Sequence, residues 1–236
     1  MAKPSERQRL LRELDAEIVV CRRCPRLVAW REEAARAKVA RFAQWDYWAR
    51  PVPGFGDPTA RVGIVGLAPA AHGGNRTGRI FTGDRSGDFL FAALYRVGFA
   101  SQPTSTHRDD GLQLRDLYIT AVNRCCPPGN RPTPAERDNC LPYLVRELRA
   151  LRDLRVVVAL GSFAWDGFLL AAAEVGHAIR PKPRFGHGSE KEVGPYHLLG
   201  CFHPSQQNTF TGKLTTSMLE EILGRARDLA LDGARA

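Results

Sequence analysis

The feature that most constrains the fold is a series of four short apolar runs separated by stretches of helical spacing. The runs lie at 62–65, 117–122, 156–160 and 197–202. Each has the length and residue types of a buried strand. Strands that alternate with helices form a mostly parallel sheet covered on both faces. We therefore predict the α/β class: a three-layer α/β/α sandwich with a central, mostly parallel four-stranded sheet.

The segments between and around these runs carry apolar residues at helical spacing. Thr133, Pro134 and Glu136 give one of them a clear start, because Thr-x-x-Glu is a capping box and proline suits the first helical position. We predict a single domain over 1–236, in which a helical segment, 1–50, packs on the α/β core. The expected helices lie at about 5–20, 26–45, 87–98, 134–153, 162–175 and 213–230.

The chain is basic, with a net charge of +9, which favours a polyanionic partner such as nucleic acid. No run approaches the roughly 18 to 20 apolar residues that a membrane-spanning helix needs. The first residues are charged and lack the apolar core of a secretory signal. We therefore expect a cytoplasmic protein without a membrane segment, and we expect it to be a monomer.

Three polar, glycine- or proline-marked loops follow predicted strands, at 66–84, 123–133 and 203–213. In an open parallel sheet, ligands bind outside the carboxyl ends of the strands. The three loops are therefore expected to share one cleft.

The chain has six cysteines, and four of them have the spacing of a metal site. Cys21 and Cys24 form a C-x-x-C pair at a predicted helix end, and Cys125 and Cys140 follow about a hundred residues later. Four such thiolates suit a tetrahedral metal ion or an iron–sulfur cluster, and spacing alone leaves zinc and [4Fe–4S] open. Small buried thiols without a metal are the alternative. Cys126 is a possible substitute ligand for Cys125, whereas Cys201 lies in an apolar run typical of a core.

Taken together, the loop sequences resemble the motifs of the uracil-DNA glycosylase superfamily. They are "GLAPA" from Gly66, "RCCPPGNRPTPAE" from Arg124 and "HPSQQNTFTGK" from His203. With the four cysteines, the resemblance extends from about Leu14 to Leu223 and points to the iron–sulfur branches, families 4 and 5. Family 4 has GEAPG as its first motif and an asparagine that reads the base. This chain has Leu67, Ala70 and Ala121 at those positions, so it is most similar to family 5, type B.

The resemblance implies a monofunctional DNA glycosylase of base-excision repair. Such an enzyme flips uracil out of double-stranded DNA at a damaged or mismatched base and hydrolyses the N-glycosidic bond, which leaves an abasic site. The small residues of the first motif imply that other deaminated bases, such as hypoxanthine, are also accepted. The resemblance further implies a structural [4Fe–4S] cluster on Cys21, Cys24, Cys125 and Cys140, with zinc as the less favoured alternative.

The resemblance also assigns roles to individual residues. His203 would donate to the departing base, Asn130 would hold the catalytic water, and Asn75 could contact either. Phe81 would stack on the flipped base, and small walls of the pocket would come from Ala68, Ala70 and Ala121. The expected DNA contacts are Arg76, Arg79, Arg131, Gln206, Gln207, Asn208 and Lys213.

Purely structural roles remain open for several of these residues. Gly129-Asn130 is also good turn chemistry, His203 could cap a strand end, and each arginine could simply be solvated. Two other functions also remain open at this point. One is a strictly uracil-specific glycosylase of the family 4 kind, and the other is a non-catalytic iron–sulfur or zinc protein that binds nucleic acid.

Overall fold

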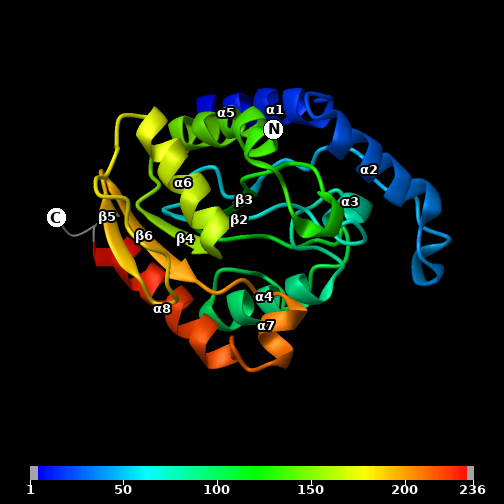
Figure 1. The fold of residues 1–236 in the computed structure, drawn as a ribbon. Helices are drawn as coiled ribbons and strands as arrows, with labels where there is room; N and C mark the ends of the chain where they lie inside the picture. The colour runs from blue at the N-terminus through cyan, green and yellow to red at the C-terminus, as the bar shows by residue number, and fades with distance from the viewer. Residues whose placement is uncertain (1–4, 233–236) are drawn as a thin grey trace.

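A six-stranded sheet runs through the middle of the protein, as seen in a computed structural model that describes residues 5–232 (Figure 1). The strand order is β1-β3-β2-β4-β6-β5. The central four strands are parallel, and β1 and β5 are antiparallel to their neighbours. The bounds are β1 Phe55–Gly56, β2 Val62–Gly66, β3 Leu117–Ala121, β4 Val156–Leu160, β5 Glu190–Val193 and β6 Tyr196–Cys201.

The α/β class and the parallel centre of the sheet are thus confirmed, and the sheet is wider than the predicted four strands. The two additional strands carry no apolar run. β1 has two residues, and β5 is the polar segment EKEV, whose first three residues are exposed. Neither has the pattern by which a buried strand is detected in a sequence.

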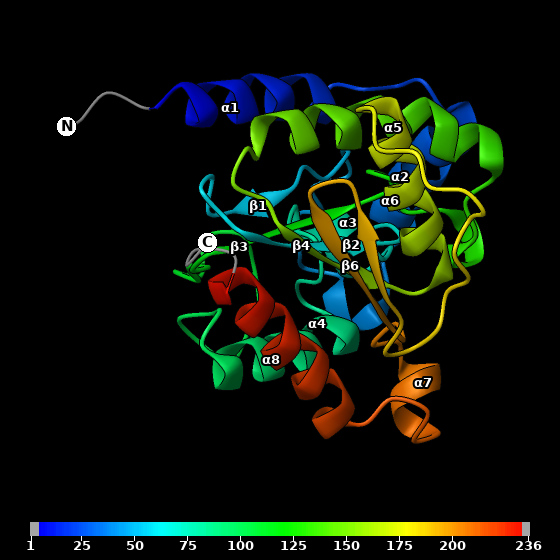
Figure 2. The ribbon, with the colours of Figure 1, turned by 90° about the vertical axis from the view of Figure 1, so that its left-hand side faces the viewer.

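Helices cover both faces of the sheet, which gives the three predicted layers (Figures 1 and 2). Val62 and Ile64 of β2 pack in the core under α4 and α8, whereas Val65 packs in the core under α5 and α6. All five residues of β2 are buried, as expected for a strand covered on both sides. The covering helices are α4 Arg85–Val97, α8 Thr216–Asp232, α5 Pro134–Ala150 and α6 Ser162–Glu174.

Helix α5 begins where the capping box predicts. The Thr133 side-chain oxygen accepts from the Glu136 N–H at 3.2 Å, and the Glu136 carboxylate accepts from the Thr133 N–H at 2.8 Å. The structure also carries α1 at Glu6–Val19, which lies along α5 (Figure 2), where Glu17 pairs with Arg146.

The second helix is shorter than predicted. Helix α2 spans Pro25–Ala37, and the chain then leaves the helix at Lys38, whose φ is 44°. A single 3-10 turn, η1, follows at Ala40–Phe42. The residues after it form an irregular segment that packs against α3.

Short helices lie in the three loops that the sequence assigned to one cleft. They are α3 at Gly74–Thr77, η2 at Pro128–Asn130 and α7 at Gln206–Phe210, after β2, β3 and β6 respectively. Among residues 5–232, no helix is both long and apolar enough to cross a membrane.

Candidate active site

The three loops meet in one pocket of about 420 Å³ outside the carboxyl ends of β2, β3 and β6. This is the position at which parallel α/β sheets bind ligands. The pocket brings together seven of the residues that the sequence singled out, together with carboxyl and hydroxyl groups that it did not. It is lined by Leu67, Ala68, Ala70, Phe81, Asp84, Ser86, Gly129, Asn130, Arg131, His203, Ser205 and Gln207.

The first loop supplies the apolar wall and an aromatic ring. Phe81 is buried and holds a left-handed backbone conformation with a φ of 53°. Its ring lies so close to Gly66 that a Cβ at that glycine would come within 2.8 Å of it. Glycine at the end of β2 therefore leaves space for the ring, which forms one side of the pocket.

His203 lies two residues beyond the end of β6 and faces Phe81, with the two ring centroids 5.8 Å apart. The Asn208 side-chain amide donates to the His203 carbonyl at 2.8 Å, so Asn208 fixes this turn from α7. Burial lowers the pKa of His203 to about 4. The imidazole is therefore neutral at pH 7 and can donate a hydrogen bond without bringing a charge into the pocket.

Asn130 lies on the opposite loop, at the end of η2, and its side chain is exposed toward the pocket mouth. Gly129 and Asn130 both have positive φ angles, of 58° and 57°. Glycine and asparagine tolerate this conformation better than other residues. Gly129 and Asn130 therefore form a turn and also line the pocket, and the turn positions the Asn130 amide.

Asp84 is a pocket residue that the sequence motifs do not indicate. It is the N-cap of α4, where its carboxylate accepts from the Gly87 N–H at 2.9 Å. Burial raises the pKa of Asp84 above its usual value. The available signal was an acidic cap before the helix predicted at 87–98. The pocket therefore does contain a carboxylate, contributed by the far end of the loop whose start is apolar.

Gly73 leaves the space that the Asp84 carboxylate occupies. A Cβ at Gly73 would lie 1.9 Å from the Asp84 Oδ2. We therefore predict that Gly73→Ala displaces the carboxylate and slows the reaction in this pocket about 100-fold, since misplacing a catalytic group by about 1 Å has effects of this size. Single-turnover rates would measure this loss. Gly224→Ala is the matched control, because open space surrounds that glycine in α8; equal rates in both variants would contradict the role of Gly73.

Four of the predicted site residues do not line this pocket and are instead buried within the fold. The Asn75 amide donates to the Arg31 carbonyl at 3.1 Å, and Ala121 is fully buried at the end of β3. Arg79 is buried in an ion pair with Asp110 at 2.7 Å. Arg76 is also buried, and its guanidinium donates to the carbonyls of His72 and Gly83.

The remaining predicted DNA contacts lie in the loops that supply the pocket residues. Arg131 and Gln207 line the pocket, while Gln206 and Lys213 are exposed in the loop that follows β6. The same loop also exposes 69% of Phe210 at the end of α7.

The four predicted ligand cysteines also converge. Cys21, Cys24, Cys125 and Cys140 line one small pocket, together with Leu27, Val28 and Tyr143. Cys126 is fully buried but is not among the lining residues. Within residues 5–232, no group of three or more Cys, His, Asp or Glu side chains has the arrangement that a single metal ion requires.

Polar groups point at three of these four sulfur atoms. Arg31, which is 2% exposed, donates to Cys125 Sγ at 3.0 Å, and the backbone N–H of Arg124 donates to Cys140 Sγ at 3.4 Å. The Asn139 amide lies 3.6 Å from Cys24 Sγ. Four converging sulfur donors, with N–H groups directed at three of them, have the donor chemistry of an iron–sulfur site.

Comparisons with known proteins agree with this geometry. A sequence model described as the uracil DNA glycosylase superfamily matches residues 53–227. The chain belongs to the uracil-DNA glycosylase superfamily. It is 57% identical over 220 residues to the type-5 uracil-DNA glycosylase of Mycobacterium tuberculosis, covering 92% of this chain and 81% of the relative.

The type-5 enzyme of Thermus thermophilus is 50% identical over 214 residues, which cover 90% of this chain and 95% of the relative. The type-4 enzyme of Archaeoglobus fulgidus matches only 114 residues, at 40% identity, or 48% of this chain and 49% of the relative. The similarity to family 5 that the first motif indicates is thus confirmed.

Proposed function

We propose that this superfamily member is a monofunctional DNA glycosylase that removes uracil from DNA in base-excision repair, acting in the cytoplasm. The observation that carries the proposal is the pocket in which Asp84, Asn130 and His203 surround an apolar floor. The high identity to type-5 uracil-DNA glycosylases supports it. The substrate would be double-stranded DNA in which the target nucleotide is flipped out into the pocket.

Each pocket residue then has a task. The flipped base stacks on Phe81, and Asp84 and Asn130 hold a water molecule on the other side of the sugar. The water oxygen attacks the sugar C1′ as the N-glycosidic bond breaks, and Asp84 accepts the water's proton. The bonding electrons leave with the base, whose developing negative charge is stabilised by the neutral His203 N–H.

The decisive experiment is incubation with a duplex oligonucleotide that carries one G·U pair, followed by alkaline cleavage at the resulting abasic site. Strand breaks at the former uracil support the proposal, and an intact strand contradicts it. Ala68 and Ala70 give the pocket a wall with few polar groups to read the edge of the base. We therefore propose that hypoxanthine is also removed. A parallel duplex with hypoxanthine separates this broad specificity from a strictly uracil-specific enzyme.

Arg131 is the exposed arginine at the pocket mouth, and we propose that it contacts a DNA phosphate. Arg131→Ala is expected to weaken duplex binding for all sequences alike. The slope of log affinity against log salt should fall by about one unit, because one fewer counterion is released. Titrations at several salt concentrations measure this, and an unchanged slope would exclude the contact.

We also propose a structural [4Fe–4S] cluster in the cysteine pocket, with zinc as the alternative. Cys21, Cys24, Cys125 and Cys140 would hold it, and the group would join the end of α1, the loop after β3 and helix α5. Its chemistry would be ligation alone. The buried cation Arg31 at Cys125 suits a group that brings negative charge.

A [4Fe–4S] cluster would make the protein brown. Replacing Cys24 with serine is expected to remove this colour and the bound iron, and to lower the free energy of unfolding by several kcal/mol. Iron analysis and thermal denaturation measure the two effects. Cys126→Ser keeps the four sulfur ligands and should keep the iron. A colourless wild-type protein with one equivalent of zinc would favour the alternative, and a metal-free wild-type protein would contradict both.

A further inference from the structure

A track of hollows leads away from the active-site pocket, and the proposed reaction does not use it. A second hollow of about 490 Å³ shares Asp84 with the active-site pocket. A third, of about 390 Å³, shares Trp45 and Arg76 with the second. Both lie in the size range of ligand sites, which begins near 300 Å³. Because each hollow adjoins the next at these shared residues, the row of hollows suits an extended ligand better than a small molecule.

The outer wall of the track is the segment 40–50, and it is firmly held on α3. The backbone N–H groups of Trp48 and Ala49 donate to the carbonyls of Arg76 and Asn75, each at 3.0 Å. The Arg76 guanidinium lies over the Phe42 ring at 3.7 Å and over the Trp45 ring at 4.1 Å. Arg76 therefore fixes the Trp45 ring in place.

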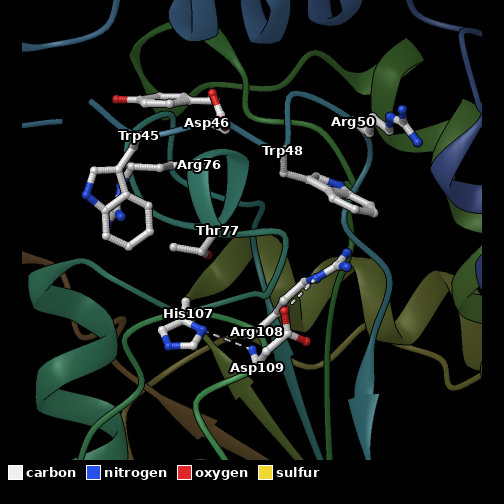
Figure 3. Close-up of a pocket in the computed structure, with 10 residues that line it drawn as sticks. Trp45, Asp46, Trp48, Arg50, Arg76, Thr77, His107, Arg108 and Asp109 are labelled. Carbon is white, nitrogen blue, oxygen red and sulfur yellow. Dashed lines mark hydrogen bonds and ion pairs between the residues drawn. The ribbon is translucent and has the colours of Figure 1, made fainter. Parts of the chain in front are cut away.

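Trp45 nevertheless remains 37% exposed. Figure 3 shows Trp45 and Trp48 on opposite sides of the third hollow, with Thr77 between them. Because the position of this exposed indole is already fixed, little side-chain entropy is lost when a flat group stacks on it. Trp45 thus gives the hollow an exposed aromatic surface on which a planar ligand can stack.

Exposed arginines surround these aromatic rings. The guanidinium groups of Arg50 and Arg108 lie 5.6 and 4.8 Å from the centre of the Trp48 ring, and Arg41 lines the second hollow. Acidic side chains offset part of this charge: Asp84 and Asp88 line the second hollow, and Asp46 and Asp109 line the third. Asp109 pairs with Arg108 at 3.3 Å. Aromatic faces alternating with guanidinium groups are the chemistry that binds single-stranded nucleic acid, through base stacking and phosphate contacts.

We propose that this track binds a single strand of DNA that continues from the nucleotide in the active site. Trp45 stacks on an unpaired base, and Arg41 and Arg50 contact phosphates. The inference rests on the proposed function for the direction of the strand, because the track begins at Asp84. A duplex cannot offer its base faces to Trp45, so the bound segment is unpaired.

The test uses single-stranded oligonucleotides with one uracil and flanks of increasing length on the 5′ or the 3′ side. For the wild-type protein, the KM for excision should fall roughly tenfold as one of the two flanks lengthens, a gain typical of stacking one base. Trp45→Leu should lose this gain and keep its single-turnover rate at saturating oligonucleotide. Trp30→Leu, which changes an equally exposed tryptophan on α2, should keep the length-dependent gain.

Arg50→Gln provides a second variant, because that exposed side chain lies over the Trp48 ring and has no hydrogen bond or ion pair among residues 5–232, so its loss leaves the Arg76 contacts intact. It should lose part of the length-dependent gain and show a weaker salt dependence. No gain with length in the wild-type protein, or the same gain in all variants, overturns the proposal. Fluorescence anisotropy with uracil-free strands keeps the two proposals separate: length-dependent binding without any excision would contradict the glycosylase activity and leave the strand site supported.

Discussion

Replacing Asp84 with asparagine is expected to slow uracil excision by about 10²–10⁴-fold, because the pocket then lacks the group that accepts the water's proton. Asparagine is also a good N-cap, so it can keep the hydrogen bond to the Gly87 N–H at the start of α4. The fold and the binding of DNA should therefore be retained. Single-turnover excision from a G·U duplex measures the loss, and the thermal midpoint verifies that the variant is folded.

The pH profile gives this prediction a second readout. Burial raises the pKa of Asp84, and only its deprotonated form accepts a proton. Wild-type excision should therefore fall as the pH falls through this raised pKa, and the residual activity of Asp84→Asn should lack that decline. A variant with wild-type rates, or with the same acidic decline, would remove Asp84 from the reaction.

The second large effect concerns His203. His203→Ala is expected to lower the single-turnover rate by about 10²–10³-fold, the usual effect of removing one donor to a developing negative charge. Because burial lowers the pKa of His203 to about 4, the imidazole is neutral from pH 5 upward. Its contribution should therefore be independent of pH between 5 and 8.

His177→Ala is the matched control, because this partly buried histidine packs on Tyr196 outside the active-site pocket. It should keep the full rate. The His203→Ala defect should also be smallest for substrates whose departing base is already a stable anion, since such bases need less stabilisation. A uniform loss across leaving groups would indicate that His203 only shapes the pocket.

The centre of the fold was predictable because burial on both faces leaves a direct trace in the sequence. Each central strand is an apolar run, and Thr133 with Glu136 marks the start of α5. Local composition carries no such trace for β1 and β5. Both are held at the sheet edges by backbone pairing, which any sequence can provide.

The active site was predicted only in part, because only some of its residues are marked by a sequence motif. His203 and Asn130 lie in motifs, Phe81 was assigned by the family resemblance, and all three line the pocket. Asp84 follows Phe81 in the same loop and was hidden by its ordinary role as a helix cap. Arg79 shows the opposite failure. Its sequence position next to the cleft suggests a phosphate contact, and its charge is instead neutralised by Asp110 from the remote stretch 100–116.

The two edge strands have a further consequence for how copies of the chain behave together. An exposed strand edge is a template on which a second molecule can add its own strand and begin to aggregate. Here one edge offers only two residues, and the other presents Glu190, Lys191 and Glu192 to solvent. Short length and dense charge both oppose such edge-to-edge growth, so concentrated solutions of this protein should remain free of sheet-mediated self-association.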